Sequence, residues 1–250
     1  MQPGVDLLHN PAGATDLVLL AHGGYEHSHK NPGLWRGPIL RMWPFAEAAR
    51  TAVPSAAVGL VRYRYRGWND VGDPALDLRA ILDELPFERV VLVGHSMGGR
   101  AVVAAGDHPR VTGVLGLAPW LPSDEPLIAL RPPVMFAHGN KDTVTSPQET
   151  RAYANRLRAA GTPVSLVFLA GETHPMLHRP ADWNTLVTTF TQHALAGGDL
   201  ADGDREWPQT GAGGSMIGAV LRLALTRLRL PVRHRFRITH PAPKANRPHP

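Results

Sequence analysis

The sequence predicts an α/β fold in which helices cover both faces of a doubly wound, mostly parallel sheet. Two features of the first 190 residues favour this class. Short apolar runs alternate with longer amphipathic segments, as strands and helices do in such proteins. Several of the short runs are apolar at every position, which is expected of strands that are buried on both faces.

Each strand is predicted where a short apolar run stands between turn residues. The first run is residues 16–22 (DLVLLAH). It is followed by residues 56–65 and by residues 89–94 (RVVLVG), which lead directly into a glycine-rich turn. The remaining strands are predicted at residues 111–119, 132–139 and 164–171.

The helices are predicted between these strands, where apolar residues recur at helical spacing. The first is residues 41–53, despite Pro44 near its start. The second is residues 74–85, with Asp73 as N-cap and Pro74 at the first helical position. The others are residues 97–106, residues 146–161 with a C-cap glycine at the end, and residues 183–195.

Composition sets limits on the chemistry. The chain has 250 residues, of which 43% are hydrophobic and 19% charged, as is typical of a globular protein with a full core. It has no cysteine, which excludes disulfides, a thiolate nucleophile and cysteine metal sites. The N-terminus does not resemble a secretory signal, and no apolar run is long enough to cross a membrane, so we expect a cytoplasmic protein.

Charge is unevenly distributed along the chain. Residues 1–206 contain all 21 acidic and 18 of the 26 basic residues, whereas the last 44 residues carry a net charge of +8. The high isoelectric point therefore belongs to the C-terminal part. With the Gly- and Asp-rich stretch before it, this predicts an α/β domain at 1–198, a linker at 199–214 and a basic amphipathic or disordered tail at 215–250.

The tail contains Arg222, Thr226 and Arg229 at a spacing that forms one polar stripe on a short apolar helix. One interpretation is weak contact with an anionic membrane surface or a partner. The other, which is slightly favoured, is a helix packed on its own domain, followed by a disordered end.

The stretch GHSMGG (94–99) predicts a catalytic nucleophile. It fits the pattern G-x-S-x-G between an apolar strand and a helix, a context in which the turn strains the serine backbone and exposes its hydroxyl. Gly94 and Gly98 would have to lack side chains because the turn is tight. Ser96 is therefore the candidate nucleophile, and the alternative is a glycine-rich turn with an incidental serine.

A serine nucleophile needs a base, and the base needs an acid that orients it. Asp142 in HGNKD and His174 in GETH each follow the end of a predicted strand, on the edge of the sheet where the turn after Gly94 also opens. Asp124 is a competing acid. His178 and His193 are competing bases, but one is farther from the strand end and the other is on a helix.

The stretch HGG (22–24) predicts donors for an oxyanion. The backbone N–H groups of Gly24 and Met97 are the two candidates. His22, His27 and His29 in the same stretch could suggest a metal site, but with Glu26 as the only nearby carboxylate we expect no metal.

Taken together, these motifs resemble the α/β-hydrolase superfamily. The resemblance covers roughly residues 16–196 and consists of HGG, RYRGWN, GHSMGG, HGNKD and GETH in that order. It implies a Ser96 nucleophile, an Asp142 acid and a His174 base, with Gly24 and Met97 as the oxyanion hole, and no cofactor is expected.

The sequence is most similar to small members of this superfamily that lack a cap. About a dozen residues separate the predicted strand that ends near Trp120 from the next one, too few for the helical cap domain that many members insert. Dienelactone-hydrolase-like proteins and small lipases and esterases share this feature. True dienelactone hydrolases use a cysteine nucleophile, which this chain lacks.

The predicted function is therefore a serine hydrolase that cleaves small-molecule carboxylic esters. An acyltransferase, a thioesterase or a peptidase would use the same residues, and a non-catalytic binding protein with this fold is a further alternative. Tyr25, Trp68 and Trp120 lie near predicted strand ends and are candidates for lining the substrate pocket, with ordinary packing as the alternative. The arginines of RYRYRGWND are expected to pair with carboxylates rather than to bind nucleic acid.

Overall fold

The structure is a computed structural model, and it describes residues 2–31, 33, 37–131, 133–198, 200–207, 226, 232 and 234–238. Within this part of the chain nine strands form one sheet in the order β8-β7-β6-β5-β4-β2-β3-β1-β9. All neighbouring strands are parallel except β1, which pairs antiparallel with both β3 and β9. The predicted doubly wound, mostly parallel sheet is confirmed.

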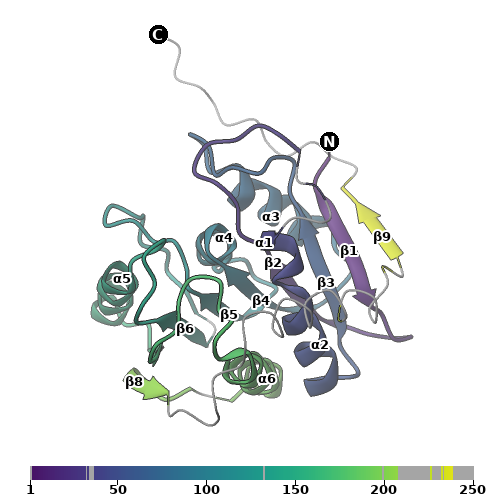
Figure 1. The fold of residues 1–250 in the computed structure, drawn as a ribbon. Coiled ribbons are helices and arrows are strands. Elements are labelled where there is room, and N and C mark those ends of the chain that lie inside the picture. Colours follow the sequence, from purple (N-terminus) through teal and green to yellow (C-terminus); the bar gives the residue numbers. More distant parts are fainter. Residues whose placement is uncertain are drawn as a thin grey trace.

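The elements follow one another along the chain as alternating strands and helices (Figure 1). The strands are β1 (Gly4–His9), β2 (Asp16–Ala21), β3 (Ala57–Arg62), β4 (Arg89–His95), β5 (Val111–Leu117), β6 (Val134–Gly139), β7 (Val164–Leu169), β8 (Gly203–Trp207) and β9 (His234–Arg237). The helices are α1 (Gly37–Leu40), α2 (Trp43–Ala52), α3 (Asp73–Glu84), α4 (Met97–Ala104), α5 (Pro147–Ala159) and α6 (Pro180–Ala196).

The helices form a layer on each face of the sheet. Buried residues of α3, α4 and α5 belong to one hydrophobic core, and those of α1, α2 and α6 belong to the other. Successive residues of β4 alternate between the two cores: Val90 and Leu92 pack with the first, Val91 and Val93 with the second. Both faces of the strand are covered, which explains why its sequence is apolar throughout.

The predicted elements agree with the observed ones to within a few residues, and two helix ends test the capping arguments. The N-cap of α3 is Gly72, in a left-handed conformation, so the prediction that Asp73 is the cap is wrong. The Asp73 carboxylate instead accepts hydrogen bonds from Asn69 and Arg64. The C-cap of α5 is Ala160 rather than the predicted glycine, and Gly161 follows it with φ +87°, a left-handed conformation that favours glycine.

Four short elements were not predicted: α1, β1, β8 and β9. The two strands β1 and β9 lie side by side at one edge of the sheet, and β8 lies at the other (Figure 1). β8 falls within the predicted linker and β9 within the predicted tail, so residues 203–207 and 234–237 are parts of the sheet rather than separate segments. The predicted amphipathic stripe falls almost entirely outside the described residues.

The connection between β5 and β6 shapes the carboxyl edge of the sheet. Its described residues, 118–131 and 133, contain turns but neither helix nor strand, in agreement with the expectation that a cap domain is missing. No helix in the described ranges is long and apolar enough to cross a membrane.

Two arginines of the RYRYRGWND stretch pair with carboxylates. Arg62 Nε lies 3.5 Å from Asp6 Oδ1. Arg64 forms an ion pair with the fully buried Asp77 and lies 3.2 Å from Asp73. These contacts tie the end of β3 to β1 and α3, and they agree with the predicted pairing.

Candidate active site

The strand–helix turn after β4 holds Ser96 in the conformation that the motif predicts. The residue has φ 57° and ψ −120°, a strained backbone for a residue with a side chain. A Cβ atom on Gly94 would lie 2.2 Å from the carbonyl oxygen of Gly98, and one on Gly98 would lie 2.1 Å from the carbonyl oxygen of Ala21. Both glycines are therefore required by the close approach of the backbone.

The structure brings Ser96, His174 and Asp142 together. Ser96 Oγ lies 3.0 Å from His174 Nε2, and His174 Nδ1 lies 2.7 Å from Asp142 Oδ2. Ser96 and His174 are partly exposed, whereas Asp142 is buried. The three side chains contact one another in the order serine, histidine, aspartate, as a nucleophile, a base and an orienting acid do.

Asp142 is oriented by the loop that carries it. Its Oδ1 accepts hydrogen bonds from the backbone N–H groups of Val144, at 2.8 Å, and Thr145, at 3.0 Å. The Thr145 hydroxyl lies 3.0 Å from Asp142 Oδ2 and 3.1 Å from His174 Nδ1. No sequence motif points to Thr145, because nothing in its local pattern separates it from an ordinary loop threonine.

The loop that carries His174 is built around a second buried acid, Glu172. Its Oε1 accepts from Thr173 N–H and lies 3.0 Å from His178 Nδ1, while its Oε2 accepts from Arg179 N–H at 2.7 Å and from Trp183 Nε1–H at 2.9 Å. This side chain is fully buried. Glu172 is part of the motif GETH, but the pattern of that motif alone predicts no role for it.

Arg41 supports the same loop from the other side of the site. It is buried between α1 and α2, and its guanidinium donates to the carbonyl oxygen of Met176. Burial lowers the pKa of Arg41 to about 10, against the opposing effect of the Glu172 charge. The guanidinium also lies over the ring of Phe45. No motif pointed to this arginine.

His95 packs directly behind the candidate base. The two imidazole centroids are 4.8 Å apart, and His95 Nε2 lies 3.2 Å from the carbonyl oxygen of His174. Burial, followed by the proximity of His174 and Arg41, lowers the pKa of His95 well below its ordinary value. The neutral ring fixes the position of the base without adding charge.

The loop after β2 lies against the nucleophile turn. A Cβ atom on Gly23 would lie 3.2 Å from Ser96 Cβ, and one on Gly24 would lie 2.2 Å from the carbonyl oxygen of Arg66 and 2.6 Å from Met97 Sδ. Met97 is the first residue of α4, where backbone N–H groups have no acceptor within the helix. Both predicted oxyanion donors therefore belong to segments that meet at Ser96.

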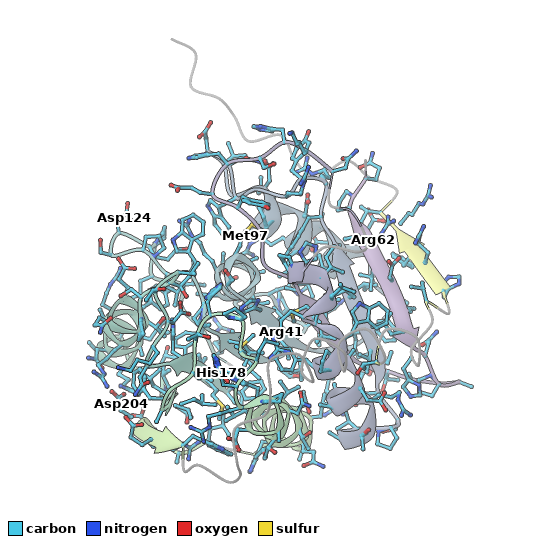
Figure 2. All side chains as sticks on the ribbon, in the orientation of Figure 1. Arg41, Arg62, Met97, Asp124, His178 and Asp204 are labelled. Atoms are coloured by element: carbon cyan, nitrogen blue, oxygen red, sulfur yellow. The ribbon has the colours of Figure 1, made fainter. Side chains whose placement is uncertain are left out.

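The competing acid and bases are placed elsewhere. Asp124 is exposed in the connection between β5 and β6, and Figure 2 shows it at the periphery of the molecule, whereas Met97 lies in the interior. His178 contacts Glu172, as described above. His193 is on α6, where its carbonyl oxygen accepts from Gly198 N–H.

The three aromatic candidates have different surroundings. Tyr25 is 52% exposed, and its backbone pairs with the segment around Gly67. Trp68 and Trp120 enclose the guanidinium of Arg100, which lies 4.0 Å from one ring centroid and 4.6 Å from the other. Trp120 N–H donates to the carbonyl oxygen of Ser96. Trp120 therefore lies beside Ser96, and Trp68 packs against Trp120 with the ring centroids 6.3 Å apart.

A cavity of about 260 Å³ lies beyond this tryptophan–arginine stack, between α3, α4 and the β5–β6 connection. Arg100 lines it together with Glu125, and their side chains form an ion pair at 2.5 Å. Trp68, Ala75, Leu76 and Ile128 are among the apolar residues that line it.

The histidines of the HGG stretch lie in different environments. His22 is buried, with Nδ1 2.8 Å from the carbonyl oxygen of Gly23. His27 is exposed beside Glu26, and the ring of His29 packs against Tyr65.

Several solved structures, some of them of proteins named as hydrolases, have a similar fold. The chain is similar to Est1E from Butyrivibrio proteoclasticus, solved with ferulic acid bound (16% identity, TM-score 0.54, covering 78% of this chain and 95% of the other). It is also similar to esterase PE8 (19% identity, TM-score 0.58, covering 78% of this chain and 100% of the other). A third similar structure is that of an acetyl ester-xyloside bifunctional hydrolase from Caldicellulosiruptor lactoaceticus (14% identity, TM-score 0.56, covering 79% of this chain and 89% of the other). At these identities the likeness shows the fold alone.

At the level of sequence, no functionally curated protein matches the chain significantly. The model of one family does match, over residues 18–238, which includes the nucleophile turn and the loops that carry Asp142 and His174. Because the match spans most of the chain, the protein belongs to the alpha/beta hydrolase family.

Proposed function

We propose that the protein is a serine hydrolase that cleaves carboxylic esters through an acyl-enzyme intermediate on Ser96. Membership of the alpha/beta hydrolase family supports hydrolase activity in general. The observation that best supports the finer proposal is the continuous chain of contacts from Ser96 Oγ to His174 and from His174 to Asp142, at 3.0 and 2.7 Å. Two similar structures named for esterase or ester-cleaving activity favour an ester over other acyl compounds.

In the proposed first half-reaction, Ser96 Oγ attacks the ester carbonyl carbon while His174 Nε2 removes the hydroxyl proton. Asp142 accepts from His174 Nδ1–H, which keeps the Nε2 lone pair directed at the serine. The N–H groups of Gly24 and Met97 bind the oxyanion of the tetrahedral intermediate. The imidazolium then protonates the departing alcohol, which leaves the acyl group on Ser96.

In the second half-reaction, water replaces the alcohol. His174 removes a proton from the water as it attacks the acyl carbonyl, and it returns that proton to Ser96 Oγ when the carboxylic acid leaves. The same residues would serve an acyltransferase, a thioesterase or a peptidase, which differ in the acceptor or the leaving group. Trp68 and Trp120 are proposed to form the wall of the substrate site because Trp120 is bonded to the backbone of Ser96.

The test is labelling by a fluorophosphonate probe, which reacts only with an activated serine. Wild-type protein should label, Ser96→Ala should not, and Ser123→Ala, which changes an exposed loop serine, should label like the wild type. A folded wild-type protein that does not label would overturn the proposal and favour a non-catalytic role. A panel of p-nitrophenyl esters, a thioester and an anilide, each with and without an added alcohol acceptor, then identifies the reaction.

A further inference from the structure

Asp142 contacts a second imidazole besides that of His174. His138 is in β6 and is fully buried. Its Nε2 lies 3.2 Å from Asp142 Oδ2, and its Nδ1 lies 2.9 Å from the hydroxyl oxygen of Thr150 on α5. Both ring nitrogens therefore have a partner, and the carboxylate oxygen that faces the candidate base lies between two imidazole rings.

The chemistry of these partners determines where the protons lie. An ionised carboxylate only accepts hydrogen bonds, so His138 Nε2 must carry a hydrogen to bond Asp142. A neutral ring then has its lone pair on Nδ1, where the Thr150 hydroxyl can donate to it. Thr150 is itself fully buried, so its hydroxyl must find a hydrogen-bond partner within the protein.

We propose that His138 is a positioning residue of the Ser96 site: its Nε2–H holds Asp142 Oδ2 where His174 Nδ1 meets it, and Thr150 fixes its tautomer. This inference rests on the proposed hydrolase mechanism. It extends the contacts of the site to five groups, in the order Thr150, His138, Asp142, His174 and Ser96.

The electrostatics of Asp142 agree with this role. Burial acts to raise the pKa of Asp142, but the hydrogen bonds from His138 and then from His174 outweigh it and hold that pKa well below its ordinary value. Besides these two rings, titratable and charged groups next to the site include His95, behind His174, Arg41, and Glu172, the buried acid of the loop that carries His174. The His138 bond withdraws charge from the same oxygen that stabilises the His174 imidazolium.

Loss of the bond should therefore have a signature in the pH profile. Without His138 Nε2–H, Asp142 presents more negative charge to His174 and favours its protonated form. The acidic limb of kcat/KM, which follows deprotonation of the free base, should move to higher pH. A residue that only fills space would change stability without moving that limb.

The experiment compares three variants, two at His138 and one at its hydrogen-bond partner Thr150. His138→Met fills the space without a donor, His138→Gln places an amide N–H near the former Nε2, and Thr150→Val removes only the hydroxyl. We expect His138→Met to lower kcat for p-nitrophenyl acetate by about tenfold with little change in KM and to shift the acidic limb upward. In His138→Gln the acidic limb should return to its wild-type position. In Thr150→Val it should shift upward by less than in His138→Met.

The following controls distinguish a failure of the proposed His138 role from a failure of the proposed hydrolase function. His9→Gln changes a histidine of β1 that contacts the carbonyl oxygen of Pro54, and it should leave kcat and the limb unchanged. If wild-type protein neither labels with fluorophosphonate nor cleaves esters, the proposed function fails. If wild type is active and a folded His138→Met variant keeps its kcat and its limb, only the role of His138 fails.

A measurement on the wild-type protein tests the proposed tautomer of His138 even if the variants do not fold. Two-bond ¹H–¹⁵N NMR spectra of the histidine rings report which nitrogen carries the proton. We expect the proton of neutral His138 on Nε2 with Nδ1 unprotonated. A His138 ring protonated only on Nδ1 would overturn the proposal, because Nε2 would then have no hydrogen to donate to Asp142.

Discussion

Glu172 offers the sharpest test of how the loop after β7 is held. Its carboxylate is fully buried and accepts from the backbone N–H groups of Thr173, His178 and Arg179 and from the indole N–H of Trp183. The change Glu172→Gln keeps the shape of the side chain but replaces one acceptor oxygen with an NH₂ group. Replacement of Oε2 leaves the buried N–H donors of Arg179 and Trp183 without an acceptor, and replacement of Oε1 leaves the partly exposed N–H groups of Thr173 and His178 without one.

The cost follows from the number of donors. A buried donor left without a partner costs about 1–3 kcal/mol, so two of them cost roughly 4 kcal/mol. This is a large part of the stability of about 5–15 kcal/mol that is typical of a folded domain. For a protein of this size, 1 kcal/mol corresponds to about 2–4 °C in Tm, so the expected decrease in Tm is about 8–16 °C.

Circular dichroism melting curves and urea titrations of wild type and Glu172→Gln measure this decrease. Glu88→Gln is the control, because that side chain is exposed and its replacement should change stability by less than about 0.5 kcal/mol. At temperatures well below the melting transition, labelling of Ser96 should also be slower in Glu172→Gln, because the loop carries His174. A Tm within about 2 °C of wild type would refute the hydrogen-bond argument.

Three further predictions concern the surroundings of the site. Gly24→Ala should lower kcat for ester cleavage by about 10²–10³ and should also lower Tm, because the new Cβ would lie 2.2 Å from the carbonyl oxygen of Arg66 and must displace the loop that carries an oxyanion donor, whereas Gly37→Ala, which has open space, should leave both unchanged; steady-state kinetics and melting curves check both. Burial lowers the pKa of His22 to about 4, so its neutral ring contributes about 3 kcal/mol of stability that is present above pH 6.5 and lost as the pH falls to 4. Urea unfolding at several pH values should show a shallower acid loss in His22→Asn, and an equal slope would contradict this. Glu125→Ala should destabilise by about 3–5 kcal/mol because it leaves the largely buried Arg100 without its partner, and the double variant Glu125→Leu with Arg100→Met should recover most of this loss; a double variant no more stable than Glu125→Ala would argue against it.

Asp77 acts in the opposite direction over the same pH range. Burial, against the opposing hydrogen bonds and charge of Arg64, raises the pKa of Asp77 to about 6. Its contribution to stability is therefore largest below pH 4 and is lost as the pH rises through 6. The acid stability of the whole protein is a difference between these contributions, which is why the His22 prediction depends on the change in slope between variant and wild type.

The edge strands show which parts of the fold a local pattern does not reveal. The strand β8 has the sequence GDREW and is largely exposed, so it carries no hydrophobic signal. It is held by pairing with β7 and by ion pairs of Asp204 with Arg151 and Arg158. These partners are about fifty residues away in the sequence. Its placement in a linker was the reasonable prediction from composition, and the tertiary contacts override it.

The central strands and the candidate site were predictable for a geometric reason. Neighbouring parallel strands are in register near their carboxyl ends: Ala21 of β2 pairs with Gly94 of β4, and Gly139 of β6 pairs with Leu169 of β7. Residues that come directly after these ends must reach the same edge of the sheet. Recognising the strands was therefore enough to bring Gly24, Ser96, Asp142 and His174 to one edge, which the contacts of the last three with one another bear out.

The positions of the residues that orient this site do not follow from the ends of the strands. Arg41 reaches Met176 from the turn between two helices, and Thr145 reaches His174 through the path of the loop after Asp142. His138 is near the end of β6, but its tautomer depends on Thr150, which the following helix α5 brings beside its ring. A sequence motif marks the atoms that would react, because the sheet determines their position. The groups that set the protonation and orientation of those atoms are defined by contacts between loops and helices, and only the three-dimensional structure reveals them.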